Sequence, residues 1–241
     1  MIAGKVVVGF CYAQSTMTPQ WRASYSMVTL RDARKTRRII GEFGHEVSGP
    51  HLPTAKCDIV RQFLAHPDKP DWLWFVDTDA TFAPDTLDRL LASAHPEKRP
   101  IVGALAFGVR PAKDAKGHDI RNSVGACPLE LFPTIYVYGE NGVGMVADYP
   151  LDQLVQCHAT GGHCLLLHRD MLADPRWLAD GHAQPWFRMA FRAGGEVSED
   201  QFFCMKAASL GFPVFVDTAV KTGHVKTFVA DEDLYLAQRG S

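Results

Sequence analysis

The sequence predicts an α/β fold built on a mostly parallel central sheet, and three observations indicate it. Apolar runs of strand length alternate with segments of helical periodicity through the first hundred residues. The 241 residues are 46% hydrophobic, which is enough to build a sizeable core. The length and the absence of an obvious linker or internal repeat favour one domain over residues 1–241.

The first half of the chain alternates strand and helix. Strands are expected at residues 5–10, 45–47, 72–76 and 100–107, and helices over 19–40, over 54–65 and from 83–85 onward. The strand at 72–76 (Trp-Leu-Trp-Phe-Val) is a continuous apolar run between polar residues, which is typical of a buried strand in a parallel sheet. Pro84 lies where helix starts favour proline.

The second half is expected to be a smaller mixed region. Residues 108–128 are polar, glycine-containing and aperiodic, which predicts a mobile loop. Further strands are expected at 134–138, 154–158, 163–168 and 213–216, and a helix over 199–210.

Charge, cysteine usage and hydropathy exclude several classes of protein. The formal net charge of −2 argues against an obligate nucleic-acid-binding protein. The six cysteines are scattered without a Cys-x-x-Cys pair, which favours buried, reduced thiols over a zinc site. No run approaches the ~20 apolar residues that span a bilayer, and the chain enters a strand too early for a signal peptide. We therefore expect a soluble, cytoplasmic protein.

Asp77 and Asp79 follow the buried strand 72–76 directly. Parallel sheets bind ligands beyond the carboxyl ends of their strands. Two carboxylates on one tight turn repel each other, and Mg²⁺ or Mn²⁺ shared with substrate phosphates relieves that repulsion. The alternative is a turn that merely precedes a helix, because Asp-x-Asp arises by chance roughly once or twice in such a chain. A second copy, Asp231-Glu-Asp233, is interpreted as a solvated surface.

The segment Phe75-Val-Asp-Thr-Asp79 resembles the Asp-x-Asp signature of GT-A-fold glycosyltransferases, especially glycosyltransferase family 2. Three further segments resemble motifs of these enzymes in order and spacing: Gly161-Gly-His-Cys-Leu-Leu-Leu-His168, Ser198-Glu-Asp-Gln-Phe-Phe203 and Asp217-Thr-Ala-Val-Lys-Thr-Gly-His224. The resemblance implies a single Rossmann-like GT-A domain. Residues 1–107 would form its nucleotide-sugar-binding half, and residues 108–241 its acceptor-side half with the C-terminal metal-ligand segment.

The resemblance also implies a metal-dependent transfer of a hexose. Asp77, Asp79 and His224 are expected to hold Mn²⁺ or Mg²⁺ on the diphosphate of a UDP- or GDP-linked sugar, where the cation stabilises the departing nucleoside diphosphate. Imidazole is a good ligand for Mn²⁺-like ions beside carboxylate oxygen. Without the other motifs, His224 reads as a surface histidine. Lys221 and Lys226 flank His224 and either neutralise the leaving diphosphate or lie on a solvated surface, as lysines usually do.

Glu199 and Asp200 follow Ser198, a good N-cap residue, and acidic residues are favoured in a first helical turn by the helix dipole alone. The resemblance implies a catalytic role for the pair. In an inverting reaction Asp200 would deprotonate the acceptor hydroxyl. In a retaining reaction it would orient the acceptor or the sugar instead.

Other residues are expected to contact the donor. Phe10 and Tyr12, at the tip of the first strand, offer aromatic rings to the nucleotide base. Lys56 stands where the family often has an Arg-Asn-like pair, and offers a point charge to the base or phosphate. Gly162 lets the sugar or acceptor pack against bare backbone. His163 and His168 are five residues apart in a strand, so one at most faces the cleft, and we expect it to be His163.

Several alternatives stay open. The chain is a glycosyltransferase by resemblance, but a nucleotidyltransferase or a non-catalytic nucleotide-sugar-binding module has similar features. A nucleotidyltransferase normally needs a glycine-rich, basic phosphate loop, which Cys11-Tyr-Ala-Gln-Ser15 lacks. The Gln-x-x-Arg-Trp motif of processive, membrane-embedded polymerases is absent. The acceptor is a glycan, a protein, a small molecule or a modified nucleobase. Trp177, Trp186 and Phe187 form a sugar platform or, the favoured reading, part of the core.

Overall fold

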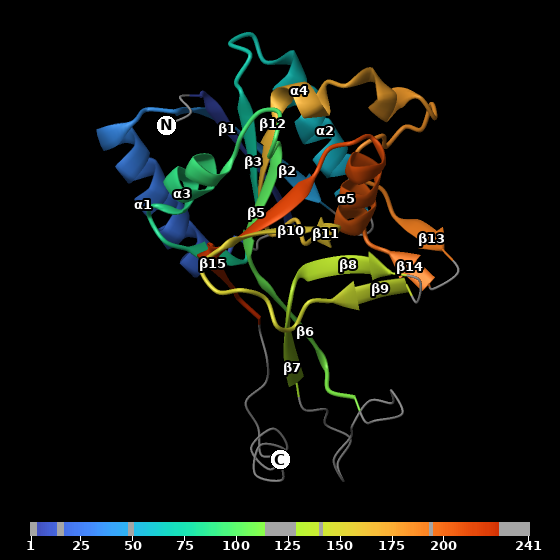
Figure 1. Cartoon of the computed structure of the whole chain (residues 1–241). Helices are drawn as coiled ribbons and strands as arrows, with labels where there is room; N and C mark the ends of the chain where they lie inside the picture. The colour runs from blue at the N-terminus through green and yellow to red at the C-terminus, as the bar shows by residue number, and fades with distance from the viewer. Residues whose placement is uncertain are drawn as a thin grey trace, which may run out of the picture.

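Apolar runs of the sequence form the strands of a central sheet. The structure is a computed structural model, and it describes residues 4–13, 17–47, 51–113, 129–139, 142–192 and 195–226. Within these residues the sheet is eight-stranded, in the order β10-β15-β5-β12-β3-β1-β2, and β4 pairs with β15 (Figure 1). Its strands are β1 (Val6–Ala13), β2 (Ile39–Val47), β3 (Trp72–Val76), β4 (Ala80–Phe82), β5 (Ile101–Leu105), β10 (Leu154–Cys157), β12 (Cys164–His168) and β15 (Val214–His224).

The sheet is mostly parallel, as the alternation of strand and helix predicts. β1 is parallel to β2 and β3, and β15 is parallel to β5. β12 lies antiparallel between β3 and β5, so β1, β2, β3, β5 and β15 all run in one direction. The carboxyl ends of these strands therefore meet at one edge of the sheet, where such sheets bind ligands.

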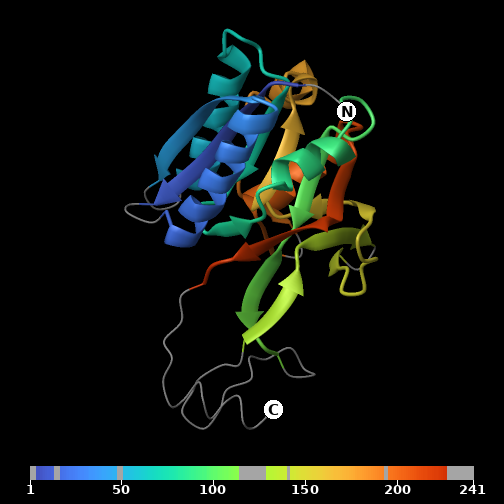
Figure 2. The ribbon, with the colours of Figure 1, turned by 90° about the vertical axis from the view of Figure 1, so that its left-hand side faces the viewer.

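Helices cover both faces of the sheet (Figures 1 and 2). They are α1 (Pro19–Lys35), α2 (Leu52–Ala65), α3 (Thr86–Ser93), α4 (Arg169–Leu172) and α5 (Glu199–Ser209), and a 3₁₀ turn follows α4 at Pro175–Leu178. Successive residues of β3 point to opposite faces. Trp72 and Trp74 pack with α1 and α3, whereas Leu73 and Phe75 pack with α2 and α5. The sheet is therefore buried on both sides.

The end of α1 differs from the prediction. The helix was expected to reach Ile40, with a strand only at 45–47, but it ends at Lys35 and β2 begins at Ile39. The carboxylate of Asp32 accepts hydrogen bonds from the backbone N–H groups of Arg38 and Ile39, both at 3.0 Å. These bonds turn the chain out of the helix and into the strand.

A smaller mixed region extends from the ligand-binding edge. It contains a hairpin of β6 (Phe107–Pro111) and β7 (Leu129–Pro133), a three-stranded sheet of β8 (Ile135–Gly139), β9 (Gly142–Met145) and β11 (Ala159–Thr160), and a hairpin of β13 (Ala190–Arg192) and β14 (Gly195–Val197). Figure 1 shows β6 and β7 reaching away from the central sheet. The predicted loop thus begins as a strand; residues 114–128 and the second Asp-x-Asp copy lie outside the described residues.

The remaining expectations about the core are confirmed where the structure describes them. Four described cysteines are buried free thiols, and Cys11 is a half-buried one; the four are Cys57, Cys157, Cys164 and Cys204. The aromatic side chains of Trp177, Trp186 and Phe187 are buried in the core, so they do not form an open sugar platform. No helix among the described residues is long and apolar enough to cross a membrane.

Candidate metal and donor site

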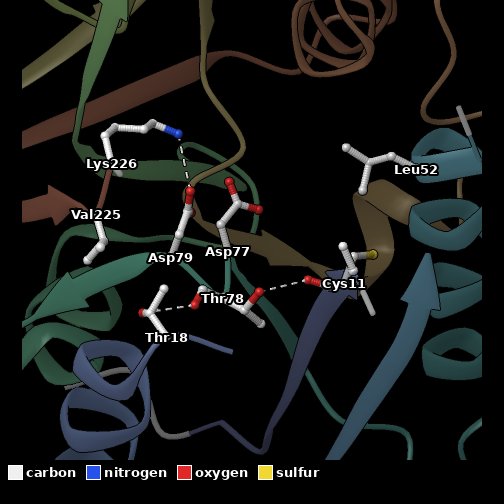
Figure 3. A pocket seen from close by; sticks show the side chains of 9 residues that line it. Cys11, Thr18, Leu52, Asp77, Thr78, Asp79, Val225 and Lys226 are labelled. Atoms are coloured by element: carbon white, nitrogen blue, oxygen red, sulfur yellow. Dashed lines mark hydrogen bonds and ion pairs between the residues drawn. The ribbon is translucent and has the colours of Figure 1, made fainter. Parts of the chain in front are cut away.

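A cavity of about 610 Å³ opens at the carboxyl ends of β1 and β3 (Figure 3). It is lined by Cys11, Ala13, Thr18, Leu52, Asp77, Thr78, Asp79, Val225 and Lys226. Figure 3 shows the carboxylates of Asp77 and Asp79 side by side, pointing the same way from the turn after β3. The structure therefore places the predicted carboxylate pair on the wall of a cavity at the expected edge of the sheet.

Strand pairing brings two histidines to this turn. His163 immediately precedes β12, and β12 pairs antiparallel with β3, so His163 lies beside Asp77. The backbone N–H of Asp77 donates to the carbonyl of His163 at 2.9 Å. His224 ends β15, whose last residues pair with β4 so that His224 lies opposite Ala80. Residues far apart in the sequence thus converge because their strands are neighbours.

The side chains of Asp79, His163 and His224 form a compact group, with one nitrogen or oxygen atom of each within 4.8 Å of the others. Nε2 of His224 is 2.9 Å from Oδ2 of Asp79. Nδ1 of His163 is 3.9 Å from Oδ1 of Asp79 and 3.5 Å from Oδ2 of Asp77. The two imidazole rings lie 4.4 Å apart between centroids. This carboxylate and imidazole set suits a divalent cation such as Mn²⁺.

Both carboxylates are held in the anionic form. Burial acts to raise the pKa of Asp79, but His224 and Lys226 outweigh it and lower that pKa to about 2. Burial also opposes the charge on Asp77, and the nearby His163 and Lys56 keep its pKa below the usual value. The two carboxylates are therefore already deprotonated, as binding of a cation by carboxylates requires.

A second group of charges lies close enough to Asp77 to interact with it electrostatically. The ammonium of Lys56, on α2, is buried and donates to Oδ1 of Asp200 at 2.6 Å and to Oε1 of Glu199 at 3.1 Å. Burial acts to lower the pKa of Lys56, but the two acids outweigh it and raise that pKa well above its usual value. Burial raises the pKa of Asp200, and Lys56 opposes this effect.

Helix α5 presents the acid pair as the sequence predicts. The hydroxyl of Ser198 accepts a hydrogen bond from the backbone N–H of Gln201 at 3.4 Å, so Ser198 is the N-cap. Glu199 and Asp200 occupy the first turn. Asp200 is fixed further by the backbone N–H of Gly162, which donates to its Oδ2 at 2.8 Å.

Gly162 has a structural role that differs from the predicted one. A Cβ atom at this position would lie 2.8 Å from Cγ of Asp200 and 2.9 Å from Nζ of Lys56. The bare backbone therefore makes room for this buried ion pair. Contact of Gly162 with the sugar or acceptor stays a prediction.

Three other predicted contacts fall elsewhere. Lys56 was expected at the nucleotide, but its ammonium is occupied by the acid pair. Phe10 is buried against Trp21, with ring centroids 5.3 Å apart, so it belongs to the core and Cys11 faces the cavity. Lys221 forms an exposed ion pair with Asp152 at 3.0 Å and does not line the cavity. Each of these three side chains has a partner that only the tertiary fold supplies, and their contact with a donor stays a prediction.

Two other predicted residues, Lys226 and His163, lie at the site. Lys226 lines the cavity, and its Nζ donates to Oδ2 of Asp79 at 3.2 Å. Tyr12 does not line the cavity: its ring packs beside that of Phe10, with centroids 6.3 Å apart, whereas Cys11 and Ala13 face the cavity. His168 lies at the opposite end of β12 from His163, so only His163 faces the site. Sequence reasoning missed Thr18 and Thr78, whose hydrogen bond shapes the cavity wall, since isolated threonines carry no recognisable signal.

No protein-family model matches the sequence, and no curated protein matches it significantly. Solved structures do resemble it. The crystal structure of A197 from STIV matches with a TM-score of 0.53 and 15% identity, over 92% of this chain and 86% of that chain. GalNAc-T7, crystallised with UDP, GalNAc and Mn²⁺, matches with a TM-score of 0.57 and 10% identity, over 98% of this chain.

The matched region is 48% of the GalNAc-T7 chain, so the present chain spans about half the length of that protein. At these identities the likeness establishes the fold. The architecture is therefore the GT-A-like α/β fold that the sequence predicts, with a large mixed sheet and its carboxyl edge open to a cavity.

Proposed function

We propose that the chain is a metal-dependent glycosyltransferase that moves a hexose from a nucleoside diphosphate sugar to an acceptor hydroxyl. The observation that carries this proposal is the position of Asp77, Asp79 and His224. Asp77 and Asp79 lie together on the wall of a cavity at the carboxyl edge of a GT-A-like sheet, and His224 contacts Asp79 there. Among the described residues, Asp77 and Asp79 are the only acidic side chains that line this cavity.

Asp77, Asp79 and His224 would hold Mn²⁺ or Mg²⁺ on the donor diphosphate. When bound, the cation neutralises negative charge that builds on the leaving group. Lys226 adds a positive charge beside Asp79. The presence of UDP and Mn²⁺ in the GalNAc-T7 structure supports a UDP-linked donor and Mn²⁺ here, and a GDP-linked donor remains the alternative.

The cavity fits a donor of this size. Small-molecule sites usually have volumes of about 300–1,000 Å³, and the cavity has about 610 Å³. Cys11 and Ala13, at the tip of β1, line the cavity, and the neighbouring Tyr12 would have to turn from its packing beside Phe10 to stack on the nucleotide base. The nucleoside would then lie over the tip of β1, with its diphosphate directed towards Asp79.

Asp200 would be the base that deprotonates the acceptor, with Glu199 beside it. Lys56 and the backbone of Gly162 each donate to one oxygen of Asp200. A carboxylate has about four lone-pair sites, so it still has capacity to accept the acceptor proton. The same two bonds equally suit a retaining enzyme in which Asp200 orients the acceptor or sugar. We favour the inverting reaction in a cytoplasmic protein, with a glycan, protein, small molecule or modified nucleobase as acceptor.

The proposal is tested by measuring release of nucleoside diphosphate from a panel of UDP- and GDP-linked sugars with Mn²⁺. We expect release from at least one donor, through slow transfer to water, and its loss in Asp79→Ala. Nuclear magnetic resonance of the released sugar gives its anomeric configuration, which separates inverting from retaining transfer.

The same assay addresses the other candidate functions. A nucleotidyltransferase would release pyrophosphate from nucleoside triphosphates and a sugar phosphate, and would leave the sugar nucleotides intact. A non-catalytic module would bind a sugar nucleotide in the presence of Mn²⁺ without releasing any product. Either outcome would contradict the transferase function.

A further inference from the structure

The group formed by Asp79, His163 and His224 contains a histidine, His163, that the predicted metal-ligand set omits. His163 is 5% exposed, and its Nδ1 is a buried nitrogen without a hydrogen-bond partner among the described residues. That atom faces the carboxylates of Asp77 and Asp79 at 3.5 and 3.9 Å. A buried polar atom without a hydrogen bond is costly, so its presence at this position needs a physical reason.

The orientation of the His163 ring is set by its other nitrogen. Nε2 lies 3.0 Å from the carbonyl oxygen of Gly223. A carbonyl oxygen only accepts hydrogen bonds, so Nε2 carries the proton and donates. In the neutral ring Nδ1 then has a free lone pair, and that lone pair points at the acidic cluster.

His224 is anchored in the same way. Its Nδ1 donates to the carbonyl oxygen of Phe107 at 3.1 Å, which directs Nε2 at Oδ2 of Asp79, 2.9 Å away; Nε2 hydrogen-bonds to that carboxylate when it carries a proton and is free to bind a cation when it does not. Histidines that ligate metals characteristically donate their second ring nitrogen to a backbone carbonyl or carboxylate. Both rings thus have the arrangement of metal ligands, because in each the nitrogen that faces the carboxylates is opposite the one that a backbone carbonyl holds.

From this geometry we propose that His163 is a protein ligand of the metal, which gives the site two imidazole ligands. The inference rests on the proposed metal-dependent function and goes further by stating which kind of cation the site prefers. Mg²⁺ prefers oxygen ligands, whereas imidazole suits borderline cations. The site therefore selects Mn²⁺ or a similar transition-metal ion over Mg²⁺.

Two substitutions separate a ligand from a structural anchor. His163→Gln places an amide N–H near the former Nε2, which preserves the bond to Gly223 and removes the nitrogen ligand. His163→Asn places its amide group near the former Nδ1 and loses the bond to Gly223. His168→Gln is the matched control, because His168 is a buried histidine at the far end of the same strand.

The experiment is calorimetric titration with MnCl₂ and with MgCl₂, alone and with UDP or GDP, followed by pulsed electron paramagnetic resonance of the Mn²⁺-loaded protein. We expect coupling to two histidine nitrogens in the wild type and to one in His163→Gln. Affinity for Mn²⁺ falls at least about tenfold in His163→Gln, the range seen when metal sites lose supporting contacts. Affinity for Mg²⁺ changes much less, and His168→Gln binds both ions like the wild type.

Coupling to a single nitrogen in the wild type, or unchanged Mn²⁺ affinity in His163→Gln, would overturn the role of His163 while the proposed function stands. A structural role alone would make His163→Asn the more damaging change and leave His163→Gln with normal metal binding. Failure of the wild type to bind either ion, with or without nucleotide, would instead remove the proposed function itself.

Discussion

Nζ of Lys56 lies 2.6 Å from Oδ1 of Asp200, 144 residues later in the chain, and both groups are largely shielded from solvent. This ion pair joins α2 to the first turn of α5, near Asp77. It fixes the carboxylate that we propose as the base, and it explains why a lysine is buried at this position.

Replacing Lys56 by Met leaves Glu199 and Asp200 as buried acids without their counter-charge. Removing one partner of a buried pair typically costs about 3–5 kcal/mol. We expect a loss of this size in the free energy of unfolding, measured by urea denaturation. Lys221→Met is the control, because its exposed pair with Asp152 should contribute less than about 1 kcal/mol. Equal losses of unfolding free energy in the two variants would show that the buried Lys56 pair stabilises the protein no more than the exposed Lys221 pair does.

Gly162→Ala introduces a Cβ atom into the space taken by Asp200 and Lys56. We expect a loss of about 1–3 kcal/mol in unfolding free energy, the usual cost of overpacking, and a displaced Asp200. Gly161→Ala is a close control, since its Cβ would meet Thr134 at an ordinary 3.5 Å. Thermal denaturation of both variants tests this, and a Gly162→Ala protein as stable as Gly161→Ala would refute it.

Asp200→Asn removes the proposed base but retains a side chain of the same shape. We expect turnover to fall by about 10²–10⁴-fold, the usual contribution of a general base. Metal-dependent binding of the nucleotide should survive, because Asp200 is not in the metal group. Steady-state assays and calorimetry on one preparation check both parts. Undiminished turnover would assign Asp200 to a purely structural role.

His168 gives a prediction about pH away from the metal. Burial lowers its pKa, and its Nδ1 accepts from the backbone N–H of Asp170 at 3.3 Å, which needs a neutral ring. The unfolded chain therefore takes up this proton more readily than the native protein. The neutral ring of His168 therefore stabilises the native protein fully above about pH 6.5, the usual histidine pKa. This contribution to the free energy of unfolding declines as the pH falls below that value.

His168→Asn retains a capping side chain and removes the titration. Urea denaturation at pH 7.5 and pH 5.5 should show that the wild type loses more unfolding free energy over this interval than the variant does. The remaining titratable groups are shared by the two proteins, so parallel losses would show that His168 has no part in the pH dependence.

Much of the fold was readable from local sequence. The apolar run Trp72–Val76 followed by Asp77 and Asp79 predicted a buried strand with a ligand site at its end, and the structure has the buried strand and a cavity there. Ser198 correctly marked the start of α5. β2 was largely missed because its glycines and alternating polar residues on a half-exposed strand give a weak periodic signal.

The partners of charged side chains could not be read in this way. A lysine on a helix normally indicates a solvated face, and nothing near Lys56 in the sequence shows that it meets Asp200. The same holds for His163, which reaches the carboxylates only because β12 inserts antiparallel between β3 and β5. Strand order is a property of the whole chain, and it determines which side chains share the site.

Metal-dependent binding of a sugar nucleotide can be measured by calorimetric titration. UDP, GDP and their sugar conjugates would be titrated into the protein with Mn²⁺ and again with EDTA. We expect binding of one nucleotide series that requires Mn²⁺, disappears in Asp79→Ala and persists in Asp85→Ala, which changes a carboxylate paired with Arg89. Absence of Mn²⁺-dependent binding for every nucleotide would contradict the proposed function.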